Sequence, residues 1–184
     1  MNNKKILRNI EATPMTDADI KDVFIEGGLN FTPRFINYLD LEDYNDINDL
    51  LDKNKRDCIF ILYPVMEPRN NGHWTLLMRD GDIFYFFDSY GGAVDAQLSY
   101  QAYKPQYKKK LLTNLLKGYK VVHNRTQYQQ DGADKQTCGR WATFFAYCWM
   151  EGMGFYQIKK ILDMIHRKTP YSFDEIISGL INDF

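Results

Sequence analysis

The sequence predicts one α+β domain of 184 residues, with helices packed on a sheet of about four or five strands. Three observations carry this prediction: β-favouring apolar runs between residues 57 and 123, helical apolar spacing on either side of them, and no repeat or low-complexity linker. The length suits one full core better than two. We expect a helical lobe over residues 1–55, a core over 56–150 and C-terminal helices over 151–184.

The N-terminal lobe contains one clear helix signal. The stretch "MTDADIKDVFIEGG" opens with a Thr16-x-x-Asp19 capping pattern and stops at Gly27-Gly28, which predicts a short helix. The later stretch "INDLLDK" repeats the helical spacing of apolar residues. These patterns are the reason for describing residues 1–55 as helical.

Four runs of residues predict the strands of the sheet. "CIFILYPV" is a continuous β-favouring run that ends at Pro64, as expected for a strand covered on both faces. "HWTLLMR" and "DIFYFFDSY" are joined across "DGD", where the Asp-Gly step predicts a hairpin. "YKVVH" predicts one more strand.

The remaining periodic segments predict helices that cover the sheet. Residues 105–117 run from a proline to just before a glycine and suit a helix. From Trp141 to Met150 nearly every position is apolar, so this helix must be buried on most sides. Residues 156–168 are amphipathic, and Ser172-x-x-Glu175 caps a last short helix.

Composition and charge exclude several classes of protein. Hydrophobic residues make up 45% of the chain, with 13 Tyr and 12 Phe, which indicates a well-packed protein rather than a disordered one. The 23 basic and 24 acidic residues leave a net charge of -1, so bulk charge favours neither a nucleic-acid binder nor an acidic tail. No apolar run follows the first lysines and none reaches about eighteen residues, so we expect neither a signal peptide nor a membrane span. The three cysteines are odd in number and lack Cys-x-x-Cys spacing, which argues against disulfides and a zinc site and favours a reducing, intracellular compartment.

Cys138 stands directly in front of the buried helix, in "DKQTCGRWATFFAYC". Free cysteine is among the most buried residue types, so a small core filler is one interpretation. The other is a nucleophile, because the unpaired N–H groups and the dipole at a helix N-terminus lower the pKa of a thiol. Cys148 lies about 15 Å along the same helix and Cys58 begins a buried strand, so neither is expected to share a site with Cys138.

Three histidines limit the search for a base. His166 lies late in an amphipathic helix among other basic residues, the usual place for a solvated cation. His123 ends a predicted strand and is a second candidate, with no carboxylate near it in sequence. His73 opens a strand that pairs through the hairpin with a strand ending in "FFDSYGG", so Asp88 reaches the same end of the sheet. A carboxylate on the far ring nitrogen fixes the tautomer and stabilises an imidazolium.

The order "GHW", "DSYGG", "QYQQ" and "TCGRW" resembles a known clan of cysteine proteases. This clan contains adenain, the adenovirus maturation protease, and the SUMO-specific proteases, and the Thr-Cys-Gly-Arg-Trp run is most similar to its virus- and virophage-encoded branch. The resemblance covers residues 57–150. It implies a papain-like architecture of the adenain type, in which a central mixed sheet packs on a buried helix that carries the nucleophile at its N-terminus.

The resemblance also assigns roles to residues of this chain. Cys138 is implied as the nucleophile, His73 as the general base and then acid, and Asp88 as the orienting carboxylate. Gly139 lets the backbone approach the substrate carbonyl closely. Trp74 is implied as a wall of the substrate cleft, and core packing is an equal alternative for it.

The clan uses a glutamine amide, together with the backbone N–H of the nucleophile, as an oxyanion hole worth about 3 kcal/mol. Gln129 is the first choice for that role and Gln130 the second, because "QYQ" resembles the branch pattern. Both lie farther from Cys138 than the clan's usual spacing, and Gln136 lies nearer. The longer loop leaves the assignment open.

By resemblance, the chain is expected to be a cysteine endopeptidase, a viral or virophage maturation protease that cuts capsid precursor protein after small residues. It would act inside the host cell and be packaged in the virion. The main alternative is a protease that removes a ubiquitin-like modifier, and a more distant clan member transfers acetyl groups through the same thiol. A catalytically silent binding module would have lost a member of the triad, and none is missing.

Basic residues are segregated in one part of the chain. From Ala96 to Gln130 there is no acidic residue, whereas the stretch contains Lys104, Lys108, Lys109, Lys110, Lys117, Lys120 and Arg125. The usual explanation is a solvated face, and the alternative is a stripe that contacts phosphates through Lys108, Lys109 and Lys110. Adenain-like enzymes use DNA as a cofactor, so DNA or a peptide is a candidate activator, with no other cofactor and no metal expected.

Overall fold

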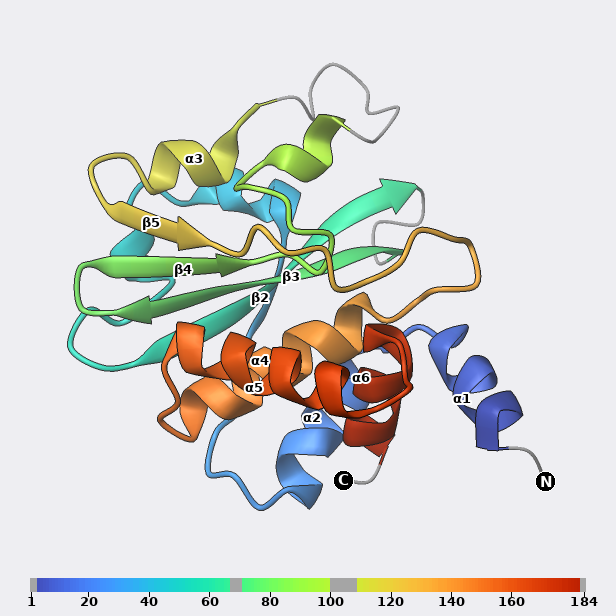
Figure 1. The fold of residues 1–184 in the computed structure, drawn as a ribbon. Coiled ribbons are helices and arrows are strands. Elements are labelled where there is room, and N and C mark those ends of the chain that lie inside the picture. The colour runs from blue at the N-terminus through green and yellow to red at the C-terminus, as the bar shows by residue number, and fades with distance from the viewer. Residues whose placement is uncertain (1–2, 67–70, 100–108, 183–184) are drawn as a thin grey trace. The chain divides into compact units, whose positions relative to one another are not determined.

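The structure is a computed structural model that describes residues 3–66, 71–99 and 109–182 (Figure 1). The chain forms two compact units. The sheet unit consists of Arg34–Thr126, and the helical unit consists of Met1–Pro33 and Gln127–Phe184. That residues 1–184 make up a single domain remains a prediction.

Within the described residues, five strands form the sheet, in the order β1-β2-β3-β4-β5. They are β1 (Phe35–Asn37), β2 (Asp57–Met66), β3 (Asn71–Asp80), β4 (Ile83–Phe87) and β5 (Lys120–His123). The three central strands pair antiparallel, whereas β1 is parallel to β2 and β5 is parallel to β4 (Figure 1). The predicted mixed sheet of about four or five strands is therefore confirmed.

The β3–β4 hairpin forms where the Asp-Gly step predicts it. Gly81 adopts a φ of 60°, a conformation that glycine reaches without steric cost. The predicted end of strand β2 at Pro64 is wrong by two residues, because the strand continues to Met66. The register shifts between these two residues, and such a bulge is one of the places where a strand tolerates proline.

The helices in the connections of the sheet unit are shorter than the sequence predicts. The stretch "INDLLDK" forms only the 3₁₀ helix η2 (Ile47–Asp49), and a second 3₁₀ helix, η1 (Tyr38–Asp43), follows the unpredicted strand β1. The predicted helix 105–117 lies partly outside the described residues, and its described part is α3 (Leu111–Leu115). A 3₁₀ helix, η3 (Ala96–Ser99), follows β4.

The helical unit is built around α4 (Cys138–Met150), which packs against α2 (Asp17–Glu26), α5 (Phe155–Lys168) and α6 (Phe173–Asn182) (Figure 1). A further helix of this unit, α1 (Asn3–Glu11), packs against α6. Trp141 and Phe145 of α4 are fully buried, and both contact the ring of Tyr128. The predicted burial of this helix on most sides is therefore confirmed.

The predicted helix caps also form. Thr16 and Asp19 bond reciprocally at the start of α2. Ser172 and Glu175 do the same ahead of α6, where the Ser172 N–H donates to the carboxylate at 2.8 Å and the Glu175 N–H donates to the hydroxyl at 3.2 Å. Among the helices that the structure describes, none combines the length and apolarity needed to cross a membrane.

Candidate active site

The hairpin of the sheet unit brings His73 and Asp88 together. Leu76 of β3 pairs with Phe87 of β4, so the residues that precede Leu76 and the residue that follows Phe87 lie at the same end of the hairpin. His73 Nε2 lies 2.8 Å from Asp88 Oδ1, and the two residues are 6% and 0% exposed. Because the carboxylate engages Nε2, Nδ1 is the ring nitrogen through which the imidazole would exchange a proton with a reacting group.

Two more groups donate hydrogen bonds to the Asp88 carboxylate. The backbone N–H of Tyr90 donates to Oδ1 at 3.0 Å, and Gln97 Nε2, on η3, donates to Oδ2 at 2.6 Å. Burial alone would raise the pKa of Asp88, but the hydrogen bond and charge of His73, with the bonds from Gln97 and Tyr90, lower the pKa below its ordinary value. The carboxylate is therefore held in its ionised form at neutral pH.

The backbone of Asp88 is fixed by the buried side chain of Asn124. The Asp88 N–H donates to Asn124 Oδ1 at 3.0 Å, and Asn124 Nδ2 donates to the Asp88 carbonyl at 2.6 Å. Both hydrogen bonds span 36 positions of sequence. Asn124 therefore ties the end of β4 to the segment that follows β5.

Close packing completes the surroundings of His73. The Tyr90 ring stacks on the imidazole with a centroid separation of 5.0 Å and an interplanar angle of 27°. A Cβ on Gly92 would lie 2.5 Å from Asp88 Oδ2, and a Cβ on Gly72 would lie 2.1 Å from a backbone oxygen of β2. Only glycine fits at these two positions, which explains the glycines of "NGHW" and "SYGG".

Trp74 lies on the other face of β3 from His73, because successive side chains of a strand alternate. Its indole is 9% exposed and packs against Phe35 and Phe60, with centroid separations of 5.6 and 6.4 Å. These contacts are the ones expected if Trp74 packs in the core of the sheet unit. The role of Trp74 in a substrate cleft remains a prediction.

Cys138 is the first residue of α4, in the helical unit, and is 7% exposed. The preceding residue, Thr137, donates its hydroxyl to Asp174 Oδ1, and Trp141 Nε1 donates to the same oxygen at 3.4 Å. Gly139, also buried, follows within the first turn. A thiol at this position faces the first-turn N–H groups and the positive end of the helix dipole.

The other two cysteines are structural in character. Burial, with the charge of Glu151 as a smaller contribution, raises the pKa of Cys148 to about 12. Burial and the charge of Asp57 likewise raise the pKa of Cys58 far above its ordinary value. Both groups therefore stay protonated at neutral pH, and a protonated thiol is a poor nucleophile.

The candidate oxyanion glutamines differ in burial. Gln129 is 2% exposed, and its Nε2 donates to the carbonyl of Lys135 at 2.6 Å. The Gln130 side chain is exposed, and its backbone N–H donates to Asp174 Oδ2 at 2.9 Å. Gln136 is partly exposed and donates to a carbonyl of its own loop at 3.1 Å. Burial thus favours Gln129 among the three, although its role stays a prediction.

The structure brings His73 and Asp88 together in the sheet unit and places Cys138, Gln129 and Gln130 in the helical unit. The alternative histidines have other surroundings: His123 is in register with Phe86, and the His166 ring stacks on Phe173.

Gln97, Asn124 and Asp174 were not predicted as site residues. For Asn124 and Gln97 the sequence offers one weak signal each: Asn124 is a polar residue just after a predicted strand, and Gln97 is a polar residue a few positions after the Gly91-Gly92 turn. Within the described ranges, no cluster of three or more His, Cys, Asp or Glu could hold a metal ion.

Known structures show the same fold. An imidazole–carboxylate pair on a mixed sheet and a cysteine at the start of a buried helix are the elements of a papain-like cysteine protease. The ASFV pS273R protease matches with a TM-score of 0.50 and 13% identity, over 95% of this chain and 68% of that one, and its selenomethionine form matches with a TM-score of 0.51 and 12% identity. The SUMO protease Ulp1 matches at a TM-score of 0.41 and 15% identity, over 95% of this chain and 81% of that one, too weakly to carry weight. The predicted resemblance is thus confirmed in the fold.

A relative encoded by a virophage is similar along nearly the whole chain. Uncharacterized protein V9 of the Sputnik virophage is 27% identical over 181 residues, which cover 95% of this chain and 97% of that protein. No family model matches the chain. The chain is therefore similar in sequence to an uncharacterized virophage protein and similar in fold to the ASFV pS273R protease.

Proposed function

We propose that this chain is a cysteine endopeptidase in which Cys138 is the nucleophile, His73 the general base and Asp88 the carboxylate that orients the imidazole. The observation that carries the proposal is the buried His73–Asp88 pair, 2.8 Å apart. The fold shared with the ASFV pS273R protease and the position of Cys138 at the start of a buried helix support it. None of these elements requires a metal or an organic cofactor.

In the proposed reaction, His73 Nδ1 takes the proton of the Cys138 thiol, and the thiolate attacks the scissile carbonyl carbon. The backbone N–H of Cys138 and the amide of Gln129, with Gln130 as the alternative, donate to the oxyanion. The imidazolium then protonates the leaving amine, and a thioester remains. Water attacks the thioester with His73 again as base, which releases the acid product and restores the thiol. Asp88 stays ionised and stabilises the imidazolium at both stages.

The proposed substrate is a capsid precursor protein, cut after small residues during virion maturation. The virophage relative and the virus-encoded structural neighbour support a viral setting. The enzyme would act inside the infected cell and be packaged in the virion. Removal of a ubiquitin-like modifier is the competing activity, and an assay with such a conjugate distinguishes the two.

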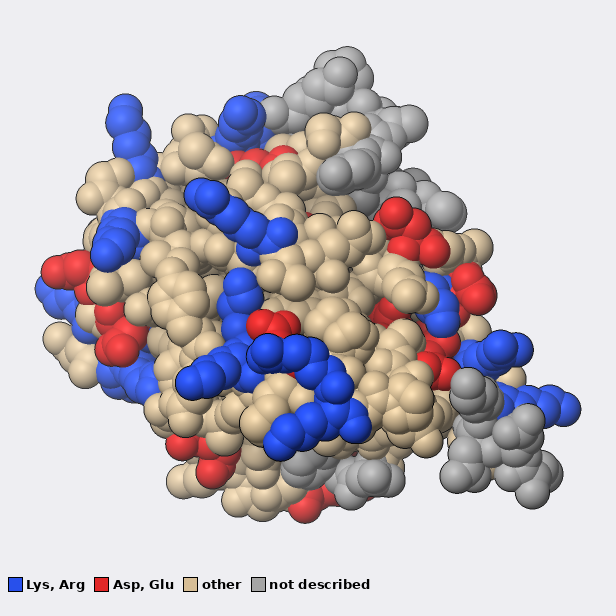
Figure 2. Space-filling view, in the orientation of Figure 1, with Lys and Arg blue, Asp and Glu red and all other residues tan. Residues whose placement is uncertain are grey.

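A DNA activator is the least supported part of the proposal. Lys108 lies outside the described residues, Lys109 Nζ pairs with Glu42 Oε1 at 2.6 Å, and Lys110 is exposed. Pairing with Glu42 reduces the charge that Lys109 offers to a phosphate. Figure 2 shows Lys and Arg side chains spread over the visible face with Asp and Glu among them, as expected for a net charge of -1. The acid-free stretch from Ala96 to Gln130 is its remaining support.

The direct test is hydrolysis of Gly-rich peptides and of a virophage capsid precursor by the purified chain, with a modifier conjugate as the second substrate. Cys138→Ala should abolish hydrolysis and leave the folded state nearly unchanged, because it removes one sulfur at a helix start. Cys148→Ala serves as the control and should keep full turnover in the folded protein. Equal activity of wild type and Cys138→Ala would contradict the proposed function.

A further inference from the structure

The carboxylate of Glu11, the last residue of α1, is buried against the loop that precedes Cys138. Glu11 is 1% exposed and pairs with Lys135 Nζ, whose side chain is 16% exposed. Its backbone carbonyl also accepts a hydrogen bond from the Gln136 N–H at 2.7 Å. Burial alone would lower the pKa of Lys135, but the hydrogen bond and charge of Glu11 outweigh it and raise that pKa. Lys135 is therefore protonated at neutral pH.

Lys135 connects this ion pair to the candidate oxyanion residue. The carbonyl of Lys135 accepts the hydrogen bond from Gln129 Nε2 at 2.6 Å. A primary amide has two N–H donors, so this bond uses one donor and restricts the directions in which the second can point. Displacement of the Lys135 backbone would therefore turn the Gln129 amide.

A second contact lies on the other side of Cys138 in sequence. The carbonyl of Thr13, two residues after Glu11, accepts a hydrogen bond from Arg140 Nη1 at 2.6 Å. Arg140 is 6% exposed and belongs to the first turn of α4. The short segment at the end of α1 thus holds residues 135, 136 and 140, which bracket the thiol along the chain.

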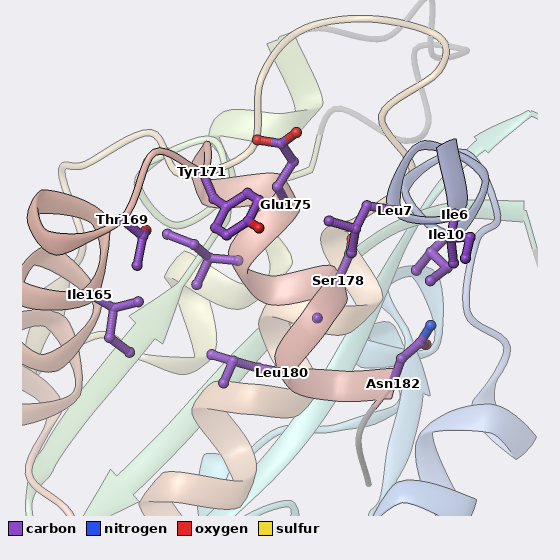
Figure 3. A pocket seen from close by; sticks show the side chains of 12 residues that line it. Ile6, Leu7, Ile10, Ile165, Thr169, Tyr171, Glu175, Ser178, Leu180 and Asn182 are labelled. Carbon is purple, nitrogen blue, oxygen red and sulfur yellow. The ribbon is translucent and has the colours of Figure 1, made fainter. Parts of the chain in front are cut away.

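The helix α1 lies against α6, beside an apolar groove. Figure 3 shows Ile6, Leu7 and Ile10 of α1 lining a groove whose other lining residues belong to α5, α6 and the turn between them. Leu7 points toward Ser178 of α6 in this view. The contact with α6, together with the bonds of Glu11 and Thr13 to residues 135, 136 and 140, defines the place of the last turn of α1.

We propose that Glu11 is a positioning residue: through Lys135 it sets the orientation of the Gln129 amide, and so the stabilisation of the oxyanion. This inference rests on the proposed function. A buried ion pair contributes little net stability compared with apolar residues of similar volume, so its use at this place is better explained by orientation than by stability. Glu11 would act on turnover without touching the substrate or the thiol.

The test compares wild type, Glu11→Gln, Lys135→Met and the double variant, each assayed well below its own Tm. We expect Glu11→Gln to lower kcat by about 10-fold or more while KM changes less than about 2-fold, because the oxyanion forms only in the transition state. Alkylation of Cys138 by iodoacetamide forms no oxyanion, so its rate should stay within about 2-fold of wild type. The double variant should lose no more than the larger single loss, because both changes break one interaction.

Asp17→Asn is the matched control, because Asp17 pairs with Lys21 on α2 with side chains 56% and 45% exposed. It should leave kcat unchanged. If Glu11→Gln does not fold, Lys135→Met replaces it with the same expected results. Unchanged kcat, an equal loss in alkylation rate, or additive losses in the double variant would overturn the positioning role. An inactive wild type would instead contradict the proposed function.

Discussion

The surroundings of His73 and those of Cys138 differ in how far along the chain most of their contacts reach. His73 and Asp88 are 15 positions apart, and the contacts of Asp88 with Tyr90 and Gln97 span 2 and 9 positions. The segment that leads to Cys138 is instead held by residues near both ends of the chain. Lys135 pairs with Glu11 across 124 positions, and Thr137 bonds Asp174 across 37 positions.

The His73–Asp88 pair thus depends mainly on the hairpin and the turn after it, whereas the segment before Cys138 depends mainly on residues from distant parts of the chain. The hairpin register places His73 and Asp88, and Asn124 adds remote support by bonding the Asp88 backbone across 36 positions. The thiol segment, residues 127–140, needs α1 and α6 to hold its form. Substitutions around His73 should therefore act on chemistry, whereas remote substitutions in the helical unit should act through the shape of the thiol segment.

The largest expected effect is that of removing the base. His73→Ala should lower kcat for peptide hydrolysis by about 10⁴-fold or more, with far less effect on KM, because no other group takes the thiol proton. His123→Ala is the matched control and should stay within about 2-fold in steady-state kinetics. A loss in His123→Ala as large as that in His73→Ala would show that the wrong histidine has been assigned.

The next effect is that of the orienting carboxylate. Asp88→Asn should lower kcat by about 10²- to 10⁴-fold, since an amide no longer stabilises the imidazolium or enforces its tautomer. Asp80 and Asp82, exposed residues at the β3–β4 turn, are the controls. If Asp80→Asn or Asp82→Asn caused as large a loss, the interpretation of the hairpin would be wrong.

A stability effect should mark the support of the thiol segment. Asp174 is fully buried and accepts hydrogen bonds from Gln130, Thr137 and Trp141. Asp174→Ala leaves these donors without their acceptor and should lower the free energy of unfolding by about 2–4 kcal/mol. Urea denaturation measures this, with Asp163→Ala on the half-buried face of α5 as a comparison. Equal midpoints for the two variants would contradict the supporting role.

The smallest predicted effect concerns Gln97. Its bond to Asp88 Oδ2 helps to lower the pKa of that carboxyl, so Gln97→Leu should raise the pKa toward its ordinary value. A lowered pKa stabilises the folded state above the pKa of the unfolded chain, about 3.9, and this stability is lost as pH falls through the folded pKa. The acid-unfolding midpoint of Gln97→Leu should therefore move to higher pH, and kcat should fall about 10-fold.

Ser99→Ala, on the same 3₁₀ helix but exposed, is the control for Gln97. It should move neither the acid-unfolding midpoint nor kcat. Identical acid-unfolding curves for Gln97→Leu and Ser99→Ala would mean that Gln97 does not influence the carboxylate.

The contrast between the two regions also explains what could be predicted from the sequence. The hairpin and the helix caps were predictable because their signals lie within a few residues of one another, as in "DGD" and Thr16-x-x-Asp19. Strand β1 was missed because three residues are too few to show a β period. Glu11, Asn124 and Asp174 were missed because their side-chain bonds to Asp88 and the thiol segment span 36 to 124 positions. Gln97, nine positions from Asp88, was missed because no motif marks its contact. Sequence spacing left Gln129 and Gln130 open, and burial separates them.

The central claim is that the Cys138 thiol and the His73 imidazole act as one unit, and the pH dependence of thiol alkylation tests it most directly. Iodoacetamide should modify wild type once, at Cys138, and the rate should already be substantial near pH 6, because the imidazolium stabilises the thiolate. In His73→Ala the rate should rise only at clearly higher pH, toward the ordinary thiol pKa of about 8.5, because only the helix N-terminus then stabilises the thiolate. Superimposable rate–pH curves for wild type and His73→Ala would contradict the account.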